Sequence, residues 1–325
     1  MILILGSSNY EQGTDPVIDW LIFYKAPFLK ITLNDLFYSD NKIKVDIQNK
    51  QIYYNNINLT QEVTVVFYRH LLESFLPILE ETYSHNRRIN KETYGEIECF
   101  INLLGQYLNC KKWFSNMESI YLNKLTVLNV AMESGLSIPY SEIVSWKEDG
   151  LNLFKKKEFK KIILKPFSDR NKSYYTFGSE SYLSFAKEFT IEDIHKLEDY
   201  FFPSLFQEKL NTEFEIRVFY LDGEFFSSAI FIEGGYTMDD RKKVMDNEKL
   251  YVVRYKLPVS IENAIIILMN KLNLSIGAID LIYTTDGMYY FLEVNPIGQY
   301  LYESEKNNFF IEKRIAEKLM KYTLV

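Results

Sequence analysis

The sequence predicts a mixed α/β (α+β) protein made of three successive parts, and three observations support this fold class. The chain opens on an apolar run, MILIL, that enters a Gly-Ser turn before a segment with helical spacing, which is typical of a β-α-β unit. Its second half is rich in strand-like segments joined by Asp-Gly turns, which favours an antiparallel sheet. With 325 residues, of which 47% are hydrophobic, the chain can supply two or three cores.

Residues 1–115 are expected to form an N-terminal α/β domain. Helical spacing within 17–31 follows the opening strand and leads into a second extended segment. The alternating pattern of 42–57 predicts paired strands, 63–70 predicts another strand, and 92–110 has the pattern of an amphipathic helix.

Residues 116–205 are expected to form a small central subdomain. The segment 119–139 predicts a helix that closes at Gly135, because a glycine at the end of a helix with Pro139 shortly beyond it is a common C-terminal stop. Strand-like SEIVSW, KIILKPF and YYTF follow, and then a polar helix that we expect to end at Pro203.

Residues 206–325 are expected to form a C-terminal domain built on an antiparallel sheet. LDGE and TTDGM supply Asp-Gly hairpin turns, and a final helix is predicted over 308–322. The strands of this sheet are expected in SLFQEKL, FEIRVFYLDGEFFSSAIFIEG, KLYVVRYKL and SIGAIDLIYTTDGMYYFLEV.

Composition excludes several classes of protein. A net charge of −7 and a pI near 5.3 argue against nucleic-acid binding, because binding to phosphate backbones depends on clustered Lys and Arg. The apolar runs are far shorter than the ~20 residues of a membrane span, and no basic stretch precedes MILIL as in a signal peptide, so we expect a cytoplasmic protein without membrane contact. Cys99 and Cys110 have no CxxC spacing, which predicts buried thiols and no disulfide framework.

The strongest chemical signal is the stretch YYFLEVNPIGQY at 289–300. Strand side chains alternate between faces, so Glu293 and Asn295 share one face while Leu292 and Val294 point into the opposite layer. A hairpin about the Asp-Gly turn would bring Asp280 close to Glu293. Three oxygen ligands at one end of a sheet suggest a magnesium ion, and the alternative is a solvated strand edge that runs into a turn.

A nucleotide is the partner that this site favours. Magnesium held by one or two carboxylates keeps positions open for phosphate oxygens. Lys165 ends the apolar strand IILK and could place its charge on phosphates, although a strand-end lysine that simply reaches solvent has the same pattern.

Together these segments resemble the ATP-grasp family over about residues 115–300. The resemblance implies the following roles, which concern ATP and Mg²⁺. Nucleotide-binding positions are Lys124, Lys165, the hinge residues Gln207, Glu208, Lys209 and Leu210, and the ribose-contacting Glu215; positions near the γ-phosphate and the acceptor carboxylate are Lys165, Arg217 and Arg241; metal ligands are Asp280, Glu293 and Asn295.

Within that family the chain is most similar to the graspetide (microviridin-type) peptide maturases, in particular the grasp-with-spasm type. The stretches that carry this likeness span most of the chain: GTDPVIDWL, VVFYRH, KKWFSN, NKLTVLNVAMESGLSIP, ILKPFS, VVRYKLP and IGAIDLIYTTDGMYYFLEVNPIGQY. The glycine-rich phosphate loop of glutamate-adding relatives is absent after Lys165. Arg254 stands where this branch usually has proline, and Glu215 replaces the more usual aspartate.

The resemblance implies an ATP-dependent ligase that activates Asp or Glu side chains of a ribosomally made precursor peptide as acyl phosphates. Ser or Thr hydroxyls would then form ω-esters, or Lys amines ω-amides, which closes macrocycles. One alternative is a RimK-like ligase that adds glutamate to a protein tail or small metabolite. Another is an inactive, nucleotide-gated peptide-binding protein. The family likeness also implies a homodimer.

The remaining candidate side chains have ordinary explanations. His70, His85 and His195 show no metal-binding spacing and are expected in structural or surface roles. Arg69 follows a strand and is expected either to contact an acidic peptide or to pair with a carboxylate. Arg241 opens the basic run RKK and coincides with a family position, which favours a functional role.

Overall fold

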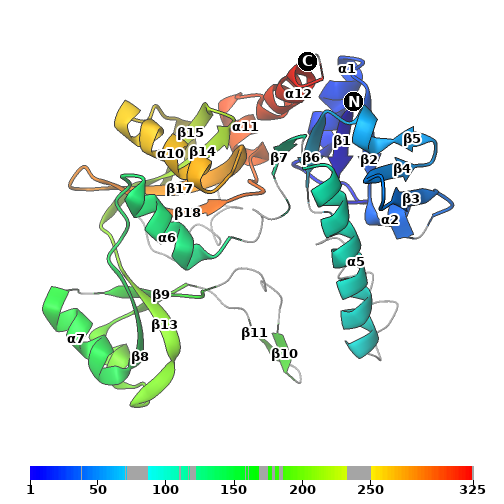
Figure 1. Ribbon diagram of the computed structural model, residues 1–325. Helices are drawn as coiled ribbons and strands as arrows, with labels where there is room; N and C mark the ends of the chain where they lie inside the picture. The colour runs from blue at the N-terminus through cyan, green and yellow to red at the C-terminus, as the bar shows by residue number, and fades with distance from the viewer. Residues whose placement is uncertain are drawn as a thin grey trace.

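The computed structural model shows three sheets of four or five strands with helices on their faces (Figure 1). The parallel N-terminal sheet lies to the right in the figure, the C-terminal sheet to the left, and the central sheet below it. The residues that the structure describes are 1–37, 39–69, 71, 87–109, 111–115, 117, 122–157, 159, 161–167, 175–177, 180–182, 186–232 and 250–323.

The N-terminal sheet is parallel and has the order β2-β1-β6-β7. Its strands are β1 (Ile2–Leu5), β2 (Phe28–Ile31), β6 (Val65–Tyr68) and β7 (Lys112–Phe114). Helix α1 (Asp15–Phe23) connects β1 to its parallel neighbour β2, so the predicted β-α-β opening is confirmed. β1 and β6 are buried along their whole length, as expected of parallel strands covered on both faces.

Smaller elements complete this part of the chain. The predicted paired strands form a three-stranded antiparallel sheet, and the predicted amphipathic helix is the long helix α5. These elements are β3 (Ile43–Asp46), β4 (Gln51–Tyr54), β5 (Ile57–Asn58), α2 (Leu33–Phe37), α3 (Leu59–Glu62) and α5 (Arg87–Tyr107). The predicted burial of the thiols is wrong for Cys99, which is exposed on α5, and Cys110 lies outside the described residues.

The central sheet is antiparallel and has the order β12-β9-β13-β8. Its strands are β8 (Ser141–Trp146), β9 (Ile162–Lys165), β12 (Lys187–Phe189) and β13 (Tyr200–Glu208). Two helices, α7 (Lys147–Lys157) and α8 (Ile191–His195), accompany the sheet, and β10 (Tyr175–Phe177) and β11 (Glu180–Tyr182) form a separate hairpin.

The predicted helix ending at Pro203 is wrong. Helix α8 is a single capped turn that ends at His195, and Pro203 lies inside β13. The pairing of β13 with β8 shifts register between Tyr200 and Ser204. A proline has no amide hydrogen to donate, so it is tolerated in a strand where the ladder is irregular.

The C-terminal sheet is antiparallel and has the order β16-β15-β14-β17-β18. Its strands are β14 (Thr212–Leu221), β15 (Glu224–Ile232), β16 (Leu250–Arg254), β17 (Ile276–Thr284) and β18 (Tyr289–Asn295). Helices α6 (Lys124–Glu133) and α10 (Val259–Lys271) share one core with this sheet. Gly135 closes α6 with φ +89°, as predicted.

The other face of the C-terminal sheet packs on the N-terminal sheet. One core cluster combines Ile4 of β1 and Leu21 of α1 with Phe219 of β14 and Ile315 of the last helix. That helix, α12 (Ile311–Lys321), follows the short α11 (Leu301–Asn307) and lies beside α1 in Figure 1. The predicted final helix is therefore confirmed, with a break before it at two residues of positive φ. The division into domains 1–115, 116–205 and 206–325 stays a prediction.

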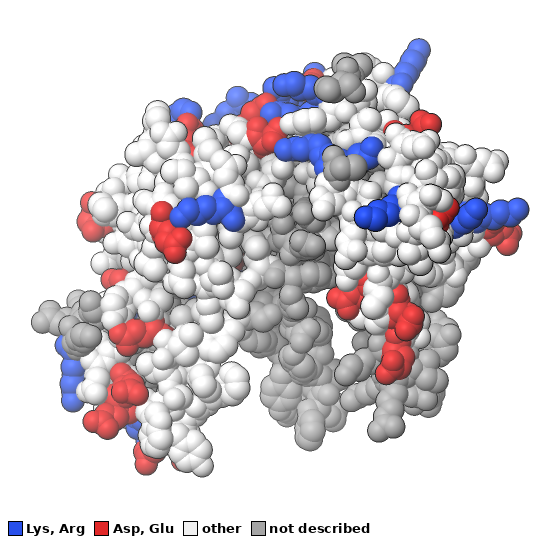
Figure 2. All heavy atoms as spheres, in the orientation of Figure 1, with Lys and Arg blue, Asp and Glu red and all other residues white. Residues whose placement is uncertain are grey.

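Charges are interspersed on the surface. Figure 2 shows acidic and basic side chains side by side over one face of the described residues. Among the described helices, none combines the length and the apolar character that a membrane span requires.

A half-buried charge cluster joins β7 to the C-terminal sheet. Asp222, in the β14–β15 turn, accepts hydrogen bonds from Lys112 (3.1 Å) and Tyr322 (2.9 Å) and lies 3.7 Å from the Lys318 ammonium. Burial alone would raise the pKa of Asp222, but these hydrogen bonds and the Lys charges lower it below its ordinary value. Because the folded-state pKa is lowered, the stabilisation is present at neutral pH and is lost as the pH falls through that pKa.

We therefore expect Asp222→Asn to lower the unfolding free energy at neutral pH by about 1–2 kcal/mol. The difference from wild type should shrink as the pH falls from the ordinary pKa of aspartate through the lowered folded-state pKa, because the unfolded and then the folded wild-type protein binds a proton at Asp222. Urea unfolding between neutral and acidic pH measures this. The exposed Asp40→Asn is the control, and an Asp222→Asn deficit that is constant across the pH range would contradict the prediction.

Candidate active site

One row of directly paired residues crosses all five strands of the C-terminal sheet. In sheet order the row contains Arg254, Ser228, Arg217, Asp280 and Glu293. Directly opposed residues of antiparallel strands lie on the same face of a sheet, so these five side chains share one face. We call them the polar row.

The polar row begins where the apolar contact between the sheets ends. Along β14, Leu221 and Phe219 belong to the core shared with the N-terminal sheet, and Arg217 is the next residue on that face. Glu215 follows two residues further on the same face, half-buried. The sheet therefore changes from apolar to charged along one face within a single strand.

Each of the two carboxylates at this end of the sheet contacts a basic side chain. Nη1 of Arg217 contacts both carboxylate oxygens of Asp280, at 2.7 and 2.6 Å, and both side chains are nearly buried. Nζ of Lys124, in the first turn of α6, contacts Oε2 of Glu293 at 2.8 Å. Asn123 caps α6 by accepting from the amides of Leu125 and Thr126, which fixes the helix end that carries Lys124.

The two predicted metal carboxylates are direct neighbours. Asp280 pairs with Glu293 across β17 and β18, so the predicted closeness of the two residues is confirmed. The register then shifts, so that Leu281 pairs with Phe291 and Leu292 is the extra residue of a bulge. Val294 packs into the core of the opposite face, as predicted, whereas the bulge residue Leu292 does not belong to that core. Two adjacent carboxylates suit a magnesium ion, which takes further ligands from water and phosphate oxygens.

Asn295 lies at the end of the same strand, but its side chain oxygen is engaged in a turn. Oδ1 of Asn295 accepts hydrogen bonds from the amides of Ile297 (3.2 Å) and Gly298 (3.3 Å), which is an Asx turn. In the described part of the chain, no group of three or more His, Cys, Asp or Glu side chains is placed to hold a metal. A magnesium site here would therefore consist of two carboxylates and an amide oxygen.

The predicted nucleotide residues lie on the central sheet and its link to β14. Lys165 ends β9 and pairs with Leu205 of β13. Gln207 is 2% exposed and donates to Oγ of Ser141 at 2.9 Å, and the amide of Glu208 donates to the carbonyl of Tyr140 at 2.8 Å. These bonds fix the end of β13.

The next two residues of the hinge are also packed. The ammonium group of Lys209 forms an ion pair with Glu188, and Leu210 is 9% exposed. The four predicted hinge residues are therefore held by the central sheet as the chain crosses to β14.

The whole chain superposes on solved ligase structures. No family model matches it, and no curated protein does. The macrocyclase MdnC of Microcystis aeruginosa MRC, bound with its precursor peptide MdnA, is 24% identical and has a TM-score of 0.78, over 99% of each chain. A RiPP-associated ATP-grasp ligase of Chryseobacterium gregarium, in complex with ADP and a leader and core peptide, is 19% identical with a TM-score of 0.80, over 99% of this chain and 96% of that one.

A third structure agrees with these two. The ATP-grasp ligase PsnB, complexed with a minimal precursor, Mg and ADP, is 16% identical with a TM-score of 0.76, over 99% of this chain and 97% of that one. The protein has the ATP-grasp fold. The sequence-based prediction of this fold is thereby confirmed over nearly the full chain, including the N-terminal part.

Within the ATP-grasp fold, the structure brings four of the predicted site residues into direct contact. These are Lys124, Arg217, Asp280 and Glu293. Asn295 is two residue pairs further along the hairpin, and Lys165 with the hinge lies on the neighbouring sheet. Arg241, His70 and His85 lie outside the described residues, as does most of the segment after Lys165 where the glycine-rich loop is missing from the sequence. His195 is exposed, as expected of a surface residue.

Two residues of the N-terminal part lie beside the turn that follows Asn295. Arg69 is fully buried, and it pairs with a carboxylate, Glu11, which confirms the second of its two predicted roles. Burial would raise the pKa of Glu11, but the charge of Arg69 and hydrogen bonds from Thr14 and Gly13 lower it. No short-range sequence pattern links Glu11 to Arg69, because 58 residues separate them.

The position of Arg254 also has a structural explanation. Its guanidinium donates to the carbonyls of Asn307 and Asn308, both at 2.7 Å, and lies over the ring of Phe309. Arg254 therefore caps the C-terminal end of α11, where carbonyl groups have no partner within the helix.

Proposed function

We propose that this protein is an ATP- and magnesium-dependent ligase that forms macrocycles in a ribosomally made precursor peptide. It would activate Asp or Glu side chains of the peptide as acyl phosphates and join them to Ser or Thr hydroxyls, or to Lys amines. The observation that carries the proposal is that Asp280 and Glu293 are direct neighbours on one sheet face, with Arg217 beside Asp280 and Lys124 beside Glu293. The structural neighbours named above, which bind precursor peptides, support the choice of substrate.

The residues present fit the expected cofactor. Asp280 and Glu293 would hold magnesium together with the amide oxygen of Asn295, since hard cations prefer oxygen ligands. A magnesium ion bound there would neutralise charge on the phosphate oxygens of ATP. Lys124 and Lys165 would bind the phosphates as point charges. The hinge at 207–210 would contact adenine, and Glu215 the ribose.

The chemistry requires charge neutralisation and positioning. A peptide carboxylate oxygen attacks the γ-phosphorus and ADP leaves, which gives an acyl phosphate. A hydroxyl or amine then attacks the acyl carbon, loses its proton, and releases phosphate. Arg217 would neutralise charge on the reacting carboxylate or phosphate, and Asp280 holds its guanidinium in one orientation through two contacts. Arg241 is proposed to assist Arg217.

The remaining expectations belong to the same proposal. The protein would act in the cytoplasm as a homodimer, and its peptide would consist of a leader and a core rich in Ser or Thr and in Asp or Glu. These statements rest on the resemblance of the sequence and on the neighbours bound to precursor peptides.

ADP release separates this proposal from its two rivals. We expect ADP formation when the protein receives ATP, Mg²⁺ and a peptide that carries both an Asp/Glu cluster and a Ser/Thr cluster. Lys165→Ala should reduce the rate about 10²-fold or more, because a phosphate-binding charge is lost. Release of ADP with free glutamate but not with the peptide would favour a RimK-like ligase. Binding of the peptide without any ADP release would favour the inactive binding protein.

A further inference from the structure

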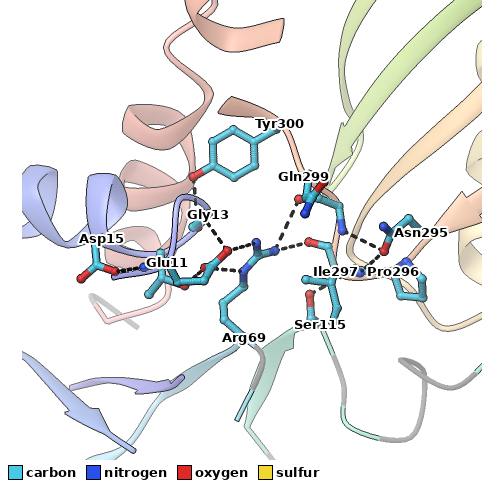
Figure 3. Close-up of polar contacts among 12 residues, drawn as sticks. Glu11, Gly13, Asp15, Arg69, Ser115, Asn295, Pro296, Ile297, Gln299 and Tyr300 are labelled. Atoms are coloured by element: carbon cyan, nitrogen blue, oxygen red, sulfur yellow. Dashed lines mark hydrogen bonds and ion pairs between the residues drawn. The ribbon is translucent and has the colours of Figure 1, made fainter. Parts of the chain in front are cut away.

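The turn that follows the metal-binding strand is held from the N-terminal part of the chain. Residues 296–298 follow Asn295, and each of their three carbonyls accepts a hydrogen bond from that part (Figure 3). The hydroxyl of Ser115, beyond β7, donates to Pro296 at 3.3 Å. Nη1 of Arg69 donates to the carbonyls of Ile297 and, at 3.5 Å, Gly298. Three successive carbonyls are thus fixed by two side chains.

Arg69 itself is fixed by a carboxylate. Its Nη2 lies 3.3 Å from Oε1 of Glu11 and its Nε 3.5 Å from Oε2, so the guanidinium presents one edge to Glu11 and another to the turn. Figure 3 shows the guanidinium between the two. Glu11 is oriented in turn by the amide of Gly13 at 2.9 Å and by the hydroxyl of Thr14.

The surrounding backbone is shaped to fit this guanidinium. A Cβ at position 13 would overlap the Arg69 guanidinium, so only glycine leaves room for it. The hydroxyl of Tyr300, which follows the turn, donates to the carbonyl of Gly13 at 3.1 Å. Hydrogen bonds are therefore donated in both directions. Arg69, after β6, donates to the turn, and Tyr300, beyond the turn, donates to Gly13 in the loop after β1.

The turn determines where Asn295 points. Its Oδ1 accepts from the amides of Ile297 and Gly298, whose carbonyls are the ones that Arg69 binds. Asn295 lies two residues from Glu293 on the same strand and pairs with Ala278. A change in the turn would therefore shift the end of the strand that carries two of the three proposed metal ligands.

We propose that Arg69, held by Glu11, is a positioning residue that fixes the 296–298 turn and so places Asn295 and Glu293 for magnesium. This inference rests on the proposed function, because it assumes that magnesium binds at those residues. Arg69 touches neither the metal ligands nor the reacting atoms. Its planar, forked guanidinium can bind a carboxylate and two carbonyls at once, which the single ammonium group of a lysine cannot do.

The test is the magnesium dependence of ADP binding. ADP is titrated calorimetrically into wild type, Arg69→Lys and Glu11→Gln, with Mg²⁺ and again with EDTA. We expect both variants to bind ADP about 10- to 100-fold more weakly than wild type with Mg²⁺, the range found when supporting partners of metal ligands are removed. In EDTA the variants and wild type should bind ADP alike, because the hinge and the lysines are unchanged.

Lys112→Met is the matched control. Lys112 also joins the N-terminal sheet to the C-terminal one, through Asp222, but the partners of its ammonium group among the described residues, Asp222, Phe114 and Tyr322, lie outside the 296–298 turn. It should lower stability without changing the effect of Mg²⁺. Circular dichroism verifies that each protein is folded at the temperature used, and Glu11→Gln serves if Arg69→Lys does not fold.

Each outcome has one meaning. A wild type that binds no ADP would remove the proposed function and this inference with it. A wild type whose ADP binding responds to Mg²⁺, together with folded Arg69→Lys and Glu11→Gln proteins that respond equally, would overturn the inference alone. An equal loss in Lys112→Met would also overturn it, since any weakening of the contact between the sheets would then suffice.

Discussion

Replacing Asp280 by asparagine is expected to lower peptide-dependent ADP release by about 10²- to 10³-fold. Asparagine has nearly the same shape as aspartate and still offers one oxygen to Arg217, so the pairing of β14 with β17 should persist. What is lost is the negative charge beside Glu293, which the proposed magnesium site needs and which balances the nearly buried Arg217.

The control for this variant lies on the same hairpin. Asp286 is exposed in the turn at the far end of β17 and β18, and Asp286→Asn makes the same chemical change away from the polar row. Initial rates of ADP release at saturating ATP measure both variants, with circular dichroism as the test of folding. An Asp280→Asn rate within about threefold of wild type would contradict the assignment, because a lost metal ligand costs far more.

Replacing Gly298 by alanine is expected to lower the unfolding free energy by about 2–4 kcal/mol. Gly298 has φ +60°, and an added Cβ would lie 3.0 Å from the amide nitrogen of Ala278, 3.1 Å from Cε2 of Phe219 and 3.2 Å from the carbonyl carbon of Gly277. Two of these three atoms are backbone atoms of β17, so the strand or the turn must move. The turn carries the amides that orient Asn295, so ADP binding with Mg²⁺ should weaken as well.

Gly135→Ala separates backbone strain from crowding. Gly135 has φ +89°, but an added Cβ there would meet no atom within 4 Å. It should cost only the strain of a positive φ, about 1 kcal/mol. Urea unfolding of both variants measures the difference. Equal losses in the two proteins would show that the close approach of Gly298 to β17 contributes nothing, contrary to the account given above.

The part of the site that could be predicted from the sequence depends on short-range geometry. The Asp-Gly turn predicts that β17 and β18 pair and that Asp280 lies close to Glu293, whereas their direct pairing depends on the bulge at Leu292, which the sequence did not predict. The two-residue period of a strand predicts that Val294 faces the core on the opposite side of the sheet from Glu293. The β-α-β opening is local in the same sense, because one helix joins two adjacent parallel strands.

The part that could not be predicted depends on contacts between distant segments. Arg217 lies beside Asp280 only because β14 is inserted between β15 and β17, which is a property of the strand order. Arg69 reaches Ile297 across 228 residues. Pro203 was expected to end a helix, but the irregular pairing of β13 with β8 accommodates it. The turn role of Asn295 had a local signal in the sequence N-P-x-G, since these residue types favour turns.

The central claim is that one peptide supplies both the carboxylate and the group that attacks it. It is tested most directly by the mass of a short peptide, rich in Ser or Thr and in Asp or Glu and encoded beside this gene, after incubation with the protein, ATP and Mg²⁺. We expect a loss of one water for each ring formed, absent with Lys165→Ala. A peptide that gains the mass of an added amino acid, or keeps its mass while no ADP forms, would contradict the claim.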